Sequence, residues 1–126
     1  RDWGHAKDYV EMQWMMLQQD NPEDFVIATG HQSTVREFIE ICATLIGWGG
    51  INWEGKGLKE IGKRKDNNQI VIRIEEKYFR PSEVDSLLGD SSKARKKLGW
   101  TSTNSIKDIA KEMLENDINE IKKNMR

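Results

Sequence analysis

Residues 24–29, with the sequence DFVIAT, constrain the fold more than any other segment. Nearly every residue in this run is apolar or β-branched, and Gly30 follows directly. Such a run is typical of a strand covered on both faces, as in a parallel sheet. Apolar residues at helical spacing then fill residues 34–46, where Thr34 and Glu37 form a capping box. A strand, a short loop and a helix in this order are half of a βαβ unit and indicate an α/β fold.

Periodicity predicts further elements on both sides of this unit. Apolar residues at helical spacing favour a helix over residues 6–19, which Asn21-Pro22 ends. The charged segment 56–66 is interpreted as a solvated loop or a single helical turn. The remaining predicted elements are strands at 51–53 and 69–74, a helix at 91–98 capped by Asp90 and ended by Gly99, and a long helix opened by Ser105 and Asp108.

Composition and charge exclude several classes of protein. The 126 residues suit one domain, and 20 basic against 21 acidic residues lack the basic surplus of a nucleic-acid binder. No apolar run approaches the ~20 residues of a membrane span, and the N-terminus lacks a secretory pattern, so we expect a cytoplasmic protein. The single cysteine, Cys42, excludes a disulfide framework or a cysteine-based zinc site within one chain and is interpreted as a buried structural thiol. Because the chain opens at Arg1 without an initiator methionine, we expect it to be part of a longer polypeptide.

Motifs for nucleotide chemistry are incomplete. Residues 57–64 match the phosphate-loop pattern GxxxxGK, but Arg64 stands where a Ser or Thr should hold magnesium. Residues 47–52 lack the third glycine of a dinucleotide-binding GxGxxG turn. Neither Tyr9 nor Tyr78 is followed four residues later by the lysine of a Tyr-xxx-Lys redox pair. These residues therefore predict no triphosphate or dinucleotide site within this chain.

Two arginines remain as candidate ligand-binding residues. Arg1 precedes a tryptophan and a predicted helix, and Arg80 follows a predicted strand. Because Pro81 disfavours helical backbone at Arg80, we expect this arginine to be presented on an extended segment, with Glu83 three residues on. A planar guanidinium can hold a phosphate by two parallel hydrogen bonds, and a carboxylate suits a pair of sugar hydroxyls. From the residues alone, two surface arginines in ordinary ion pairs are the alternative.

Several segments resemble a known family. They are residues 1–11 (RDWGHAKDYVE), 24–30 (DFVIATG), 78–85 (YFRPSEVD), 88–90 (LGD) and 97–100 (KLGW). In order and approximate spacing they are similar to GDP-mannose 4,6-dehydratases, within the extended short-chain dehydrogenase/reductase superfamily. The resemblance covers essentially this whole chain but only about the last third of such an enzyme.

The resemblance implies an NADP-dependent enzyme with a Rossmann domain and a smaller C-terminal lobe that grips the nucleotide sugar. Such an enzyme oxidises C4 of the mannose in GDP-mannose, eliminates water across C5 and C6, and returns the hydride at C6, which gives GDP-4-keto-6-deoxy-mannose. By matching position, Arg1 and Arg80 are expected to bind the diphosphate, and Glu83 the ribose. No catalytic residue is expected here, because the glycine-rich NADP loop, the catalytic Thr or Ser, the Glu base and the Tyr-xxx-Lys pair belong upstream. This chain alone is therefore expected to bind no NADP and to be inactive.

The same resemblance predicts how the fragment 1–126 is organised. Residues 1–46 are expected to pack on the Rossmann sheet, most of which is missing here, and 47–126 to form the nucleotide-sugar-binding lobe and C-terminal helices. The parts left uncovered favour a homo-oligomer. A fragment of another nucleotide-sugar epimerase or reductase and a stand-alone helical binding module remain the alternatives.

Overall fold

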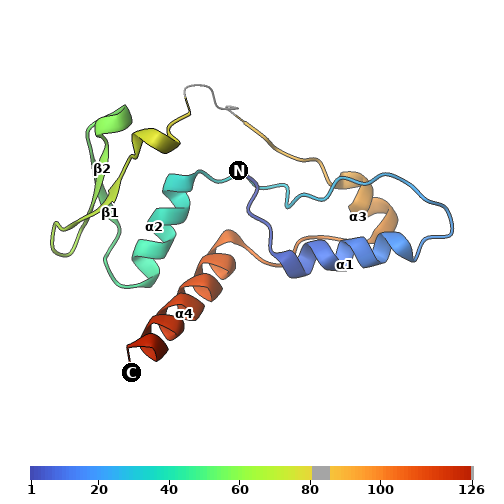
Figure 1. Cartoon of the computed structure of the whole chain (residues 1–126). Helices are drawn as coiled ribbons and strands as arrows, with labels where there is room; N and C mark the ends of the chain where they lie inside the picture. Colours follow the sequence, from blue (N-terminus) through green and yellow to red (C-terminus); the bar gives the residue numbers. More distant parts are fainter. Residues whose placement is uncertain (81–85, 126) are drawn as a thin grey trace.

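The computed structural model describes residues 1–80 and 86–125. These contain four α-helices and a small antiparallel sheet, so the expected mixture of helices and short strands is confirmed at this level. Figure 1 shows the sheet at one end, α1 and α3 at the other, and α2 and α4 between them. The elements are α1 (Ala6–Leu17), α2 (Val35–Leu45), β1 (Ile51–Glu54), the 3₁₀ turn η1 (Gly57–Lys59), β2 (Ile61–Arg64), β3 (Ile70–Arg73), the 3₁₀ turn η2 (Glu76–Tyr78), α3 (Ser92–Leu98) and α4 (Ile106–Asn124).

The predicted capping box of Thr34 and Glu37 is present, and Ser105 and Asp108 open α4 as predicted. The Thr34 hydroxyl accepts a hydrogen bond from the Glu37 amide at 3.0 Å, and the Glu37 carboxylate accepts one from the Thr34 amide at 2.6 Å. Ser105 and Asp108 form the same reciprocal pair at the start of α4. Since an N-cap side chain contributes about 1 kcal/mol, these residues fix where the two helices begin.

The strand predicted for residues 24–29 is wrong. This segment pairs with no strand in the described part of the chain. A strand needs a neighbour for its amides and carbonyls, and a doubly covered one needs a sheet around it. In this structure, side chains rather than a neighbouring strand bind some of the backbone amides and carbonyls of residues 24–29. The Asp2 carboxylate accepts a hydrogen bond from the Thr29 amide at 2.8 Å, and the Lys93 ammonium donates one to the Asp24 carbonyl at 2.8 Å.

The interpretation of 56–66 as a loop or a single turn is also wrong in part, because this segment holds η1 and then β2. β2 is the central strand of the antiparallel order β1-β2-β3, in which Trp53 faces Gly62 and Ile61 faces Arg73. A Cβ at Gly62 would lie 3.0 Å from side-chain atoms of both Ile51 and Ile72. Because glycine has no side chain, Ile51 and Ile72 can pack directly over Gly62 at the centre of the sheet. The hydropathy pattern of the segment does not reveal this packing role.

The main core joins α1 to α3. Its buried residues are Met12, Ala94 and Trp100, and partly buried apolar residues of α1, α3 and the segment 25–27 surround them. The Trp100 indole donates a hydrogen bond to the Asp8 carbonyl at 2.9 Å, which ties the segment just after α3 to α1. Gly99, with a φ of 70°, ends α3 as predicted. No helix among the described residues is long and apolar enough to cross a membrane.

The Asp8 carboxylate is buried and fastens α1 to the segment that leads into α4. It accepts hydrogen bonds from the Thr103 hydroxyl at 2.7 Å, the Thr103 amide at 3.1 Å, and the Asn104 amide and side chain at 3.0 Å each. Ser102 adds a fifth at 3.2 Å. Burial by itself raises the pKa of Asp8, but these hydrogen bonds outweigh it and hold the pKa at about 2, below its ordinary 3.8.

Candidate functional site

Arg1 and Arg80 line one cavity. Although they are separated by almost the whole first two thirds of the chain, both face the same open hollow, which has a volume of about 630 Å³. That volume lies within the range of about 300–1,000 Å³ found for small-molecule sites. The cavity is lined by Arg1, Arg73, Ile74, Glu75, Tyr78, Phe79 and Arg80.

Arg1 is positioned by the loop that leads into α2. Its nitrogen donates to the Ser33 carbonyl at 2.8 Å, and its carbonyl accepts from the Ser33 amide at 2.9 Å. The Trp3 indole donates to the same Ser33 carbonyl at 3.1 Å. The Trp3 ring also stacks on Phe38 of α2, with the ring centroids 4.5 Å apart. The extended stretch 1–3 is therefore anchored beside α2, and the Arg1 side chain starts from a fixed backbone.

The other residues that line the cavity belong to one short segment, which begins where β3 ends. After Arg73 the chain makes the turn η2, in which the Tyr78 amide donates to the Glu75 carbonyl at 3.0 Å. Phe79 then takes an extended conformation, with φ −70° and ψ 129°, and leads into Arg80. Arg73, which precedes this turn in the chain, and Arg80, which follows it, thus line the same cavity.

The chemistry of this cavity is that of an anion site with apolar surface beside it. Among the described residues, the lining holds three guanidinium groups, those of Arg1, Arg73 and Arg80, and one carboxylate, that of Glu75. The Tyr78 ring is 74% exposed, and Phe79 is about half exposed. Guanidinium forks recognise phosphates, and exposed rings offer faces for a base or a sugar.

Of the site residues predicted from the sequence, Arg1 and Arg80 lie at this cavity, and Glu83 lies outside the described residues. The cavity brings Arg1 and Arg80 together, which neither residue's neighbours in the sequence reveal. Glu83 and Pro81 lie outside the described residues, so the predicted ribose contact of Glu83 stays a prediction. Arg73 was missed, because an arginine that interrupts an apolar strand looks like any residue on the solvated face of a sheet.

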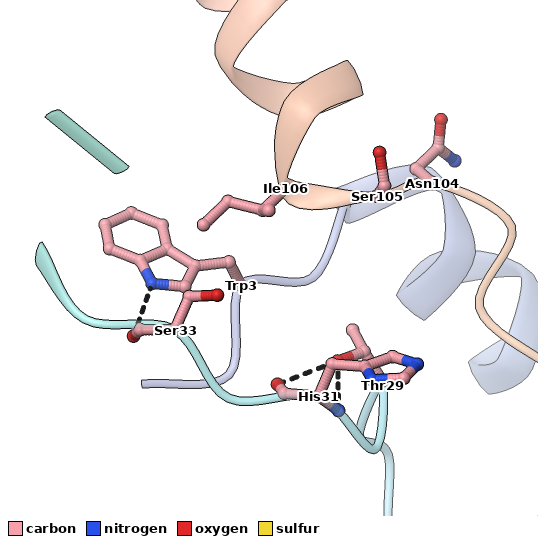
Figure 2. A pocket seen from close by; sticks show the side chains of 7 residues that line it. All are labelled: Trp3, Thr29, His31, Ser33, Asn104, Ser105 and Ile106. Carbon is pink, nitrogen blue, oxygen red and sulfur yellow. Dashed lines mark hydrogen bonds between the residues drawn. The ribbon is translucent and has the colours of Figure 1, made fainter. Parts of the chain in front are cut away.

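A smaller hollow lies between the start of the chain and the start of α4 (Figure 2). Several of its polar groups bind one another: the Trp3 indole donates to the Ser33 carbonyl, and the Thr29 hydroxyl accepts from the His31 amide at 3.1 Å. At about 130 Å³ it is below the size of ordinary ligand sites. We interpret it as a packing junction. It is lined by Trp3, Thr29, His31, Ser33, Asn104, Ser105 and Ile106.

The other residues considered in the sequence, those of the phosphate-loop pattern and Cys42, show no arrangement that indicates a binding or catalytic site. Lys63, which would serve a phosphate loop, lies in β2 and pairs with Glu54 at 2.6 Å. Arg64 binds Asp66 and lies over the Trp48 ring. Cys42 is partly buried, and burial raises the pKa of its thiol, as suits a structural cysteine. Within residues 1–80 and 86–125, no group of three His, Cys, Asp or Glu side chains is placed to hold a metal ion.

Comparison with known proteins gives consistent matches. A family described as GDP-mannose 4,6 dehydratase matches residues 1–113. The chain is 49% identical to a GDP-mannose 4,6-dehydratase of Yersinia enterocolitica, over 97% of this chain and 35% of that protein. It is 50% identical to GDP-mannose 4,6 dehydratase 2 of Caenorhabditis elegans, over 94% of this chain and 30% of the relative. It is 49% identical to the human GDP-mannose 4,6 dehydratase, over 94% of this chain and 32% of the human protein. The chain therefore spans about a third of the length of these relatives.

Proposed function

Because this chain belongs to the GDP-mannose 4,6-dehydratase family, we propose that its arginine-lined cavity binds the diphosphate of GDP-mannose. The observation that carries this proposal is the convergence of Arg1 and Arg80 on one hollow of substrate size. Two guanidinium groups from opposite walls can each hold a phosphate through parallel hydrogen bonds. The high identity to dehydratases argues against an epimerase, a reductase or an unrelated binding module.

The proposed reaction is that of the family: conversion of GDP-mannose to GDP-4-keto-6-deoxy-mannose, with NADP as the hydride carrier. The residues of this chain do not fit NADP, since it has neither a GxGxxG turn nor a Tyr-xxx-Lys pair. We therefore assign this chain to substrate binding only. In that role Arg1 and Arg80 hold the diphosphate, Glu83 accepts from the ribose hydroxyls, and the rings of Tyr78 and Phe79 provide apolar contact.

The proposed organisation follows the same logic. Residues 1–46 pack against a Rossmann sheet, and residues 47–126 form the lobe that closes over the nucleotide sugar. Support comes from α1, whose Val10, Trp14 and Leu17 side chains are 61%, 62% and 81% exposed. Apolar side chains this open are costly in water, so another polypeptide surface is expected to cover them. That surface is either the sheet or another copy of the chain, and we propose a cytoplasmic homo-oligomer.

The test is the affinity of the natural protein that carries this sequence for GDP-mannose, measured by calorimetry. A charge-assisted hydrogen bond contributes about 1.5–3 kcal/mol, so Arg80→Ala is expected to weaken binding roughly tenfold to hundredfold. Arg80→Lys should recover only part of the loss, because an ammonium keeps the charge without the fork. NADP affinity should be unchanged.

The matched control is Arg95→Ala, which removes an exposed arginine of α3, outside the residues that line the cavity. It should leave the affinity for GDP-mannose as it is. If Arg80→Ala binds GDP-mannose as tightly as the unchanged protein does, Arg80 is a surface ion-pairing residue and the proposal is wrong.

A further inference from the structure

We propose that Arg73 is a third arginine that contacts the diphosphate and so helps determine the preference for diphosphate nucleotides. The inference rests on the proposed function of the cavity and extends it to Arg73, a residue that the sequence did not single out as a site residue. It starts from the lining of the cavity, in which Arg73 joins Arg1 and Arg80.

The backbone of Arg73 is fixed by the sheet. It is the last residue of β3 and faces Ile61 across the antiparallel ladder with β2. The preceding residue, Ile72, packs over Gly62 at the centre of the sheet. Because neighbouring strand residues point to opposite faces, the Arg73 side chain leaves on the other face from Ile72. Its guanidinium therefore extends from a rigid element, which suits a ligand contact.

The side chain of Arg73 differs from the other arginines close to the sheet. Arg36 binds Glu60 and lies 4.4 Å over the Trp53 ring, and Arg64 binds Asp66 and lies 4.4 Å over Trp48. The guanidinium groups of Arg36 and Arg64 thus each form an ion pair with a carboxylate and a cation–π contact with a tryptophan ring. Among the described residues, the Arg73 guanidinium has neither an ion pair nor a hydrogen bond, and it is exposed at the cavity.

The charge of the cavity fits a diphosphate better than a single phosphate. Among the described lining residues there are three guanidinium groups, those of Arg1, Arg73 and Arg80, and one carboxylate, that of Glu75. A diphosphate presents two linked anions, each able to accept from a separate guanidinium fork. Glu75 would repel phosphate but can accept hydrogen bonds from sugar or ribose hydroxyls. A ligand with two phosphates thus offers an acceptor to more than one of the arginines that line the cavity.

The experiment compares GDP with guanosine as ligands of the natural protein, using calorimetry or competition against GDP-mannose. Arg73→Ala should lower the affinity for GDP about tenfold. The affinity for guanosine, which has no phosphate, should not change. Arg73→Lys should recover part of the GDP affinity. Added salt should weaken GDP binding less steeply in Arg73→Ala than in the unchanged protein, since one charged contact is gone. Arg95→Ala serves as the control for a general loss of positive charge.

Each outcome decides between distinct conclusions. If GDP binding falls with Arg80→Ala but not with Arg73→Ala, this inference is wrong and the proposed function stands. If the unchanged protein binds neither GDP nor GDP-mannose, both are wrong. If Arg73→Ala weakens guanosine as much as GDP, the residue shapes the cavity without contacting phosphate, which also overturns the inference. Thermal unfolding of each variant shows whether the fold is retained.

Discussion

Replacing Asp8 by asparagine tests whether the carboxylate at the junction of α1 and α4 stabilises the fold by the amount that its hydrogen bonds indicate. Asparagine has nearly the same shape but no charge, and its amide nitrogen brings donors toward the donors of Thr103 and Asn104. One pKa unit corresponds to about 1.4 kcal/mol, so a fall from 3.8 to about 2 corresponds to about 2 kcal/mol. We therefore expect Asp8→Asn to lower the free energy of unfolding by about 2–3 kcal/mol at neutral pH.

The pH dependence of this loss follows from the direction of the pKa shift. The folded state holds the Asp8 carboxylate more strongly in its ionised form than the unfolded state does. The contribution is therefore complete above the unfolded pKa of 3.8 and is lost as the pH falls through the folded value of about 2. Other carboxylates titrate in the same range, but they do so equally in both proteins. The difference between the unchanged protein and Asp8→Asn isolates Asp8.

The assay is urea unfolding followed by tryptophan fluorescence, since Trp100 is buried in the core beside Asp8. It is run on both proteins at several values between about pH 7 and about pH 2. Asp20→Asn is the matched control, because Asp20 is exposed and takes part in no hydrogen bond among residues 1–80 and 86–125. Equal stability of the unchanged protein and Asp8→Asn at neutral pH would refute the reasoning. A difference that stays constant as the solution is acidified would refute the assigned pKa.

Two further predictions concern activity and association. The isolated 126-residue chain, supplied with NADP and GDP-mannose, should form no keto sugar, because it contains no dinucleotide loop and no Tyr-xxx-Lys pair; detectable product would contradict this. The isolated chain should also sediment as dimers or larger species at micromolar concentrations, because the side chains of Trp14 and Leu17 are open to water. Trp14→Glu should shift it toward monomer, and a compact monomer before any substitution would speak against the expected oligomer.

Local signals were the part of the fold that could be predicted from the sequence. Both capping boxes and the glycine end of α3 depend on residues within a few positions of each other, so their prediction needed no knowledge of the rest of the chain. The strand expected at 24–29 depended on pairing partners that the described chain does not supply. Pairing also created the missed strand β2, in which Gly62, Lys63 and Arg64 hide any alternation of apolar residues.

In the candidate site, too, residue types could be predicted from the sequence, whereas the contacts between distant segments could not. The residue types at Arg1 and Arg80 suggested phosphate binding, but only the family resemblance, and not the sequence around either residue, predicted that both bind one diphosphate. Their meeting depends on the backbone pairing of Arg1 with Ser33 and on the turn η2. Arg73 enters the site only through the register of β3, which the sequence does not specify. Tertiary pairing thus decides which arginines become neighbours.

The two walls of the cavity belong to segments that are remote in the chain, one at Arg1 and the other after β3. An anion that touches both walls therefore works as a noncovalent tether between them. By mass action, a ligand that binds only the folded arrangement stabilises it, by about 2.7 kcal/mol at a hundred times its dissociation constant. Occupancy of the cavity by such an anion and the hydrogen bonds that anchor Arg1 at Ser33 would consequently stabilise each other.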